Sequence, residues 1–122
     1  MDVAELARQG VAVIVGTCDA ALVPAVTRGW GPVLSADGSR LTLCVDAPEG
    51  SPTRANLEAG SPLAVTMSRP TSYLSVQLKG PVVALGEPDA AATGAVAAHL
   101  EAVVAETVAI GVPPTLMRAL AG

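Results

Sequence analysis

Short runs of alternating apolar and polar residues fill the first part of the chain, and these runs predict β-strands. Successive side chains of a strand point to opposite faces of a sheet, so alternation indicates one buried face and one exposed face. Pro81 and Trp30-Gly31-Pro32 predict bulges or edge positions, because proline cannot donate to a β-ladder. The predicted strands are 11–17, 22–29, 40–45, 62–68 and 72–80, with 82–85 continuing the last one.

Four other segments carry helix signals. Asp or Ser stands before two of them, proline lies at or near the start of three, and glycine ends two. The third segment is Ala-rich, with apolar residues at helical spacing. We expect helices over 3–9, 51–60, 88–107 and 113–120.

The order of these elements favours a mainly β, α+β fold. Strands joined by short turns such as Asp37-Gly38, without a helix after each strand, favour a small antiparallel barrel over a doubly wound parallel sheet. The chain has 122 residues and shows neither a repeat nor a linker. We therefore expect a single domain, with a barrel core over about 10–86 and a helical tail over about 88–120.

Composition limits the core and the partners. The chain is 51% apolar and lacks Phe, so its core must consist of small aliphatic side chains. A net charge of −4 and seven scattered Lys and Arg residues argue against nucleic acid as a partner. The apolar runs are too short to span a bilayer, and the start of the chain does not resemble a secretory signal. We expect a cytoplasmic protein with no membrane partner.

Metal and thiol chemistry have little support in the sequence. Cys18 and Cys44 lack the spacing of a metal or redox motif, and we expect free buried thiols. His99 is the only histidine and has no partner at ligand spacing, so no metal site is expected.

Ser51-Pro52-Thr53-Arg54 is the first candidate for ligand binding, as an anion site. The first turn of a helix leaves backbone N–H groups unpaired, and its dipole favours negative charge. Arg54 adds a planar cation suited to phosphate, and the hydroxyls of Ser51 and Thr53 can donate hydrogen bonds. The alternative is an ordinary capped helix with one exposed arginine.

The segment 24–30 is the second candidate. Arg28 is an isolated charge at the end of a strand with apolar flanks, where it can reach a phosphate or a ring carbonyl. Trp30 can cover a planar ligand. The alternative is a solvent-facing edge arginine and a tryptophan that fills the core.

A polar row on the strand 72–80 is the third candidate. Tyr73, Ser75, Gln77 and Lys79 share one face of that strand by alternation. The amide of Gln77 both donates and accepts, so it can recognise a heterocycle that carries both kinds of group. The alternative is a solvated face of the sheet.

Side chains for catalysis are not evident. No nucleophile motif, Gly-rich phosphate loop or carboxylate pair is present, so the catalytic residues remain unknown. Any chemistry is expected to come from a cofactor.

Taken in order, these features resemble the flavin-binding split-barrel proteins related to pyridoxamine 5′-phosphate oxidase. The resemblance covers about Leu6 to Gly86. It rests on Val11–Thr17, Pro24 to Arg28, the Asp37-Gly38 hairpin with Leu41-Thr42-Leu43, Ser51–Leu57 and the strand that ends in Gly80.

The resemblance implies a six-stranded antiparallel split barrel that forms a homodimer with flavin mononucleotide (FMN) at the subunit interface. It implies that Ser51 and Arg54 hold the phosphate, that residues 27–28 line the ribityl chain or ring, and that Ser75 and Gln77 face the isoalloxazine. The implied cofactor-binding residues are Thr27, Arg28, Trp30, Ser51, Thr53, Arg54, Ser75 and Gln77.

The expected function is that of a flavin-dependent oxidoreductase acting on a small organic substrate. The Arg-rich C-terminal substrate segment of the true pyridoxamine phosphate oxidases is not visible, and an Ala-rich tail stands in its place. The substrate therefore stays open. The alternatives are a non-catalytic module of the same fold that binds a deazaflavin or haem, and a plain interaction domain.

Overall fold

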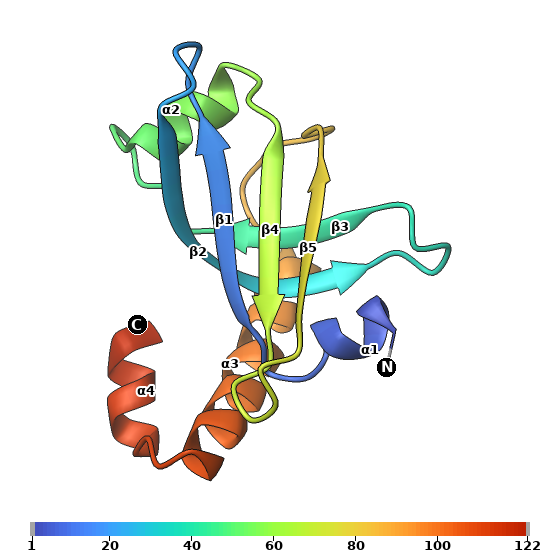
Figure 1. Ribbon diagram of the computed structural model, residues 1–122, viewed down its shortest axis with the longest axis vertical. Helices are drawn as coiled ribbons and strands as arrows, with labels where there is room; N and C mark the ends of the chain where they lie inside the picture. Colours follow the sequence, from blue (N-terminus) through green and yellow to red (C-terminus); the bar gives the residue numbers. More distant parts are fainter. Residues whose placement is uncertain (1, 122) are drawn as a thin grey trace.

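A five-stranded antiparallel sheet with four helices around it forms the structure, a computed structural model that describes residues 2–121 (Figure 1). The strands lie in the order β3-β2-β1-β4-β5. In chain order the elements are α1 (Val3–Ala7), β1 (Ala12–Cys18), β2 (Pro24–Leu34), β3 (Leu41–Val45), α2 (Pro52–Glu58), β4 (Leu63–Ser68), β5 (Ser75–Gly80), α3 (Ala90–Ala109) and α4 (Pro114–Ala121). The mainly antiparallel, α+β class predicted from the sequence is confirmed.

A bend in β2 gives the sheet its curvature. The register between β2 and β3 shifts between Trp30 and Val33, where Gly31 has a φ of +64° and Pro32 has no N–H to donate. The first half of β2 runs beside β1, and its second half, with β3, crosses behind β1, β4 and β5 (Figure 1). One long strand thus serves both parts of the sheet.

The core lies on the concave side of this curved sheet. Val13 and Val15 of β1 pack there with Val65 and Met67 of β4, and all four are at most 4% exposed. Leu6 of α1 covers one end of the cluster. These side chains are the buried partners that the alternation along β1 and β4 predicts.

The sheet differs from the predicted barrel at β5 and beyond. Tyr73 has a φ of +59° and lies in the hairpin loop, so β5 begins at Ser75 rather than at residue 72. After Pro81, the predicted continuation over 82–85 is not a strand, and its backbone makes no hydrogen bond to the backbone of any described residue. Within residues 2–121 the sheet is therefore open, with β3 and β5 at its edges.

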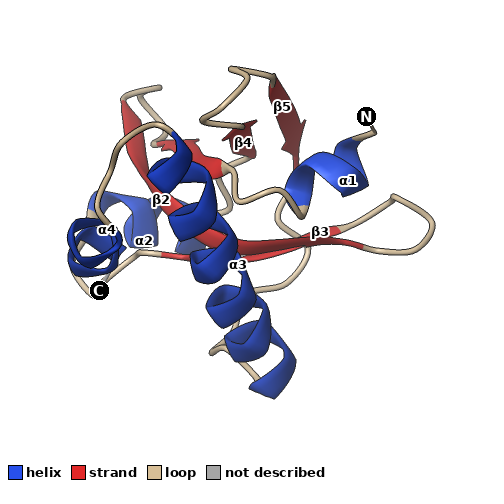
Figure 2. Cartoon of the chain, turned by 90° about the horizontal axis from the view of Figure 1, so that it is seen from below, coloured by secondary structure: helices blue, strands red, loops and turns tan. Residues whose placement is uncertain are grey.

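Helix α3 docks against the bend of β2 (Figure 2). A buried histidine makes the contact. His99 is 6% exposed; its Nδ1 accepts from the Gly31 N–H at 3.0 Å, and its Nε2 lies 2.8 Å from the Val11 carbonyl oxygen. Because Nδ1 accepts, Nε2 must carry the proton and donate to Val11. No local pattern in the sequence indicates this role.

Two glycines let α3 approach the sheet so closely. A Cβ on Gly10 would lie 2.2 Å from the Ala102 carbonyl oxygen, and one on Gly31 would lie 2.8 Å from the Val96 nitrogen. Both glycines have positive φ, which other residues rarely adopt.

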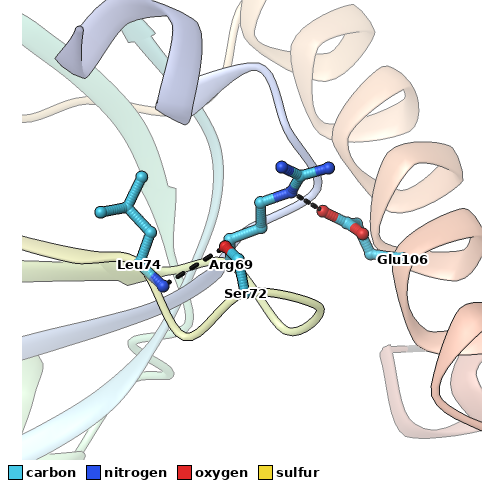
Figure 3. A network of polar contacts seen from close by, with 4 residues as sticks. All are labelled: Arg69, Ser72, Leu74 and Glu106. Atoms are coloured by element: carbon cyan, nitrogen blue, oxygen red, sulfur yellow. Dashed lines mark hydrogen bonds and ion pairs between the residues drawn. The ribbon is translucent and has the colours of Figure 1, made fainter. Parts of the chain in front are cut away.

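A half-buried ion pair ties the same helix to the β4–β5 hairpin (Figure 3). Arg69 Nε donates to Glu106 Oε1 at 2.5 Å. The loop is closed by its own bonds, including Leu74 N–H to the Ser72 hydroxyl at 3.4 Å. The β4–β5 hairpin is thus tied to α3.

The cysteines and the helices are also the subject of predictions from the sequence. Cys18 and Cys44 are free, as predicted, but they are half-buried and not fully buried. Over residues 2–121, no helix combines the length and the apolar character needed to cross a membrane.

Replacing His99 with leucine is expected to lower the free energy of unfolding by about 2–5 kcal/mol near pH 7.5, because the Gly31 N–H and the Val11 carbonyl lose their buried partner. Burial lowers the pKa of His99 below its usual 6.5, against the opposing bond to Val11. The contribution of the neutral ring is therefore complete above about pH 6.5 and is lost as the pH falls through the folded-state pKa.

Urea denaturation of both proteins near pH 7.5 and near pH 5.5 measures the effect. The difference between wild type and variant should be smaller at the lower pH. An equal difference at both pH values would show that protonation of His99 is not linked to loss of its bonds to Gly31 and Val11.

Candidate functional site

The start of α2 is built as the sequence predicted. Ser51 is the N-cap, with φ −74° and ψ 150°, and its hydroxyl oxygen accepts from the Arg54 N–H at 3.2 Å. Pro52 occupies the first turn, where its missing N–H costs nothing. Buried Asn56 anchors the helix to β1 by donating to the Thr17 hydroxyl at 3.1 Å.

The loop 46–51 gathers several of the predicted residues, and we call this region, with Thr27 and Arg54, the α2 corner. Arg54 Nε donates to the Ala47 carbonyl at 2.8 Å, and the Thr27 hydroxyl donates to the Asp46 carbonyl at 2.6 Å. The Asp46 N–H in turn donates to the Arg28 carbonyl at 3.0 Å. Side chains from β2 and α2 thus hold one short loop between them.

Arg54 is the cation that this corner offers to a ligand. Only its Nε is engaged, and its two terminal nitrogens make no hydrogen bond to any residue of 2–121. A helix of seven residues has a weak dipole, so the guanidinium rather than the helix end supplies the positive charge. The Ser51 hydroxyl, which accepts from Arg54, keeps its own proton for a second bond.

Thr53 lies apart from this group. It is 4% exposed, on the face of α2 that packs inward. A ligand in the α2 corner would meet Ser51 and Arg54 and not the Thr53 hydroxyl.

Four neighbouring residues, three of them polar, lie side by side across the strands on the convex, outer face of the sheet. Arg28, Ile14, Thr66 and Gln77 are direct neighbours on β2, β1, β4 and β5, and cross-strand neighbours share a face. Gln77 Nε2 donates to the Thr66 hydroxyl at 3.0 Å. Three strand spacings separate Arg28 from Gln77, roughly 14 Å.

Ser75 lies on the same face, one pair further along. Its hydroxyl lies 2.8 Å from that of Ser68 on β4 and donates to the Tyr73 carbonyl at 3.1 Å. The predicted row on β5 therefore begins at Ser75, and Tyr73 stands in the hairpin loop, 88% exposed. Lys79 continues the row beside Ala64.

The β-register separates Thr27 from Arg28. Thr27 pairs with buried Val15 and faces the concave side, whereas Arg28 pairs with Ile14 and faces outward. The two side chains therefore lie on opposite faces of β2, and a ligand on the outer face would meet Arg28 but not Thr27.

Trp30 also has another place than the predicted one. Its ring packs against His99, with centroids 5.6 Å apart, and against Val103, Val104 and Met117 of α3 and α4. It fills the interface between the sheet and these helices, which is the alternative that the sequence left open.

Sequence reasoning missed Thr66 and Ser68, the β4 partners of Gln77 and Ser75. Alternation along β4 already placed both residues opposite the buried face, and pairing β4 with β5 would have found them. The backbone carbonyls of Asp46 and Ala47 accept hydrogen bonds from Thr27 and Arg54, and no side-chain pattern in the sequence indicates such contacts.

The arrangement offers binding groups and not an acid–base pair. Within residues 2–121, no three His, Cys, Asp or Glu side chains gather as a metal site. The α2 corner and the polar row on β5 lie on different parts of one chain and do not converge. Compared with protein-family models, curated proteins and solved structures, the chain matches none of them.

Replacing Ser51 with alanine is expected to lower the free energy of unfolding by about 1 kcal/mol, through loss of the helix cap. Aspartate at this position caps as well as serine, so Ser51→Asp should keep near-wild-type stability. Urea denaturation of the two variants measures the cap. Equal destabilisation by both would contradict the capping role.

Proposed function

We propose that this protein is an FMN-binding oxidoreductase of the split-barrel type that acts on a small organic substrate. The observation that carries the proposal is an Arg54 guanidinium with two unengaged nitrogens beside the Ser51 hydroxyl, together with the Gln77 amide on an exposed sheet face. The first pair suits a phosphate, and an amide suits the donors and acceptors of a flavin ring.

A homodimer is part of the proposal, because the two groups do not meet within one chain. The outer face between them carries exposed Ile14 and Val26, at 43% and 72%, beside the small residues Gly16 and Ala64. A second copy seated on this face buries the apolar side chains and brings the polar row of one chain toward the corner of the other. The cofactor would then bind between subunits.

In this proposal the open sheet is a split barrel, and the segment 82–85 takes the place of its sixth strand. The segment follows β5 directly and borders the same interior as β3. Because the segment makes no backbone–backbone hydrogen bond with the described residues, the barrel wall is not closed by strand pairing there.

Bound FMN would supply a hydride acceptor, and the protein would bind and orient it. Arg54 and Ser51 would fix the phosphate, and Gln77 would bind the ring. Haem fits less well, because both ring nitrogens of His99 already hold backbone groups and cannot bind iron.

Titration with FMN, followed by flavin absorbance and fluorescence, tests the site. Arg54→Ala should weaken FMN binding by about 10- to 100-fold, which is the effect of losing a charged hydrogen bond worth about 1.5–3 kcal/mol. Riboflavin lacks the phosphate, so its binding should not change. Ser51→Asp keeps the cap and should weaken FMN through charge repulsion.

The exposed Arg8→Ala variant is the matched control and should bind FMN as wild type does. Loss of FMN and riboflavin binding together in Arg54→Ala would mean damage to the fold. No binding of FMN to the wild type would overturn the proposal, and tighter binding of a deazaflavin would reassign the cofactor.

The dimer makes a separate prediction. Sedimentation equilibrium should give twice the chain mass of 12.1 kDa. Val26→Asp should yield a monomer and weaken FMN binding, because it places a charge in the proposed interface. Val83→Asp is the matched control, since Val83 is 70% exposed but lies on the segment after β5. A wild-type monomer would contradict the shared site.

A further inference from the structure

A cavity of about 700 Å3 lies on the concave side of the sheet. It is bordered by β3 on one side and by β5 with the segment 81–85 on the other. Leu78 of β5 lines it, whereas the neighbouring Gln77 faces the outer side of the sheet. The cavity is therefore separated from the proposed flavin site by the thickness of the sheet.

The cavity is partly open to solvent, and its volume is far above that of an ordinary packing void. Cores pack about as densely as organic crystals, and their voids rarely exceed a water molecule. A volume between about 300 and 1,000 Å3 is typical of ligand pockets. Most of the wall consists of aliphatic side chains, among them Leu34, Leu41, Leu43, Val65, Leu78 and Val82.

The rim of the cavity is cationic. The lining contains Arg40 and neither Asp nor Glu, although the chain carries a net charge of −4. Lys79 borders the cavity as well, but alternation along β5 directs its side chain to the outer face with Gln77. Within residues 2–121 Arg40 has no carboxylate within 4.0 Å, because the ion pairs are Arg69–Glu106 and Arg118–Glu101. Asp37, in the hairpin that precedes Arg40, is occupied by the hydroxyls of Ser35 and Ser39.

The rim also offers backbone donors. Val82, Val83, Ala84 and Leu85 make no backbone–backbone hydrogen bond with any part of the chain that the structure describes. Val83 and Leu85 are 70% and 58% exposed, so apolar side chains stand at the opening as well. An occupant with a long apolar part and an anionic end would satisfy both kinds of group.

We propose that this cavity binds a long-chain aliphatic carboxylate. The hydrocarbon chain lies among the leucine and valine side chains, where its burial provides the affinity. The carboxylate lies at the rim with Arg40 and the unpaired backbone N–H groups of residues 82–85. The site is independent of the proposed FMN site, so both ligands bind at once.

Calorimetric titration of the purified full chain with palmitate, below its micellar concentration, tests the proposal. We expect one palmitate per chain, confirmed by native mass spectrometry. Octanoate should bind more than tenfold more weakly because it buries fewer methylene groups, and hexadecanol more than tenfold more weakly because it lacks the charge. Phosphatidylglycerol vesicles should not bind, which separates a free acid from an acyl chain within a lipid.

Two variants place the ligand. Arg40→Gln should weaken palmitate about tenfold and leave hexadecanol unchanged, and Arg8→Gln is the matched control away from the cavity. Val82→Trp should abolish palmitate binding by filling the opening, with FMN binding retained as evidence of folding. If Val82→Trp does not fold, Leu41→Trp replaces it.

Absence of palmitate binding would overturn the proposal, as would equal binding of hexadecanol together with an unaffected Arg40→Gln variant. Binding to the vesicles without binding to palmitate would also overturn it. Hydrogen exchange gives an independent check. The amides of 82–85 should exchange rapidly in the ligand-free protein and slowly with palmitate, and strong protection without ligand would show a closed wall and no cavity.

Discussion

One buried imidazole joins the helical tail to the sheet, and much of the architecture depends on it. His99 uses one ring nitrogen to satisfy the Gly31 N–H and the other to satisfy the Val11 carbonyl. Both groups lie where regular strand pairing is interrupted, and each would be costly to bury without a partner. The contact requires the neutral ring in one tautomer, and it requires close approach of α3, which Gly10 and Gly31 permit.

The position of α3 decides which face of the sheet remains open. At the bend of β2, the helix covers Trp30 and removes it from any ligand. Further up β2, no helix covers Arg28 and Val26, so the outer face stays exposed there. The same docking therefore withdraws one predicted site residue and leaves another accessible.

Local signals in the sequence predicted much of this structure. The caps Asp2 and Ser51 and the alternation along β1, β3 and β4 depend on near neighbours in the chain, and they gave the four helices and most strands. The left-handed conformation of Tyr73 and the lack of pairing after Pro81 depend on the surrounding fold, so β5 began later and no sixth strand formed.

The candidate site was predictable to the same degree. Ser51 and Arg54 lie together because four consecutive residues form one helical turn. The bonds of His99 and the contact of Trp30 join residues that lie between 68 and 88 positions apart, and no local pattern reports such contacts. The opposite faces of Thr27 and Arg28, in contrast, follow from the alternation of neighbouring residues along a strand.

Strand β5 connects the two proposed binding regions. Gln77 points to the outer face, and Leu78 points into the cavity, because adjacent residues of a strand face opposite ways. A shift of one residue in the pairing of β5 with β4 would place the amide in the aliphatic interior and the leucine on the outer face. The turn at Tyr73, closed by its N–H bond to the Arg69 carbonyl at 2.9 Å, fixes one end of β5, and Pro81 fixes the other. A polar outer face and an aliphatic interior therefore exist together only because these two short features set the register.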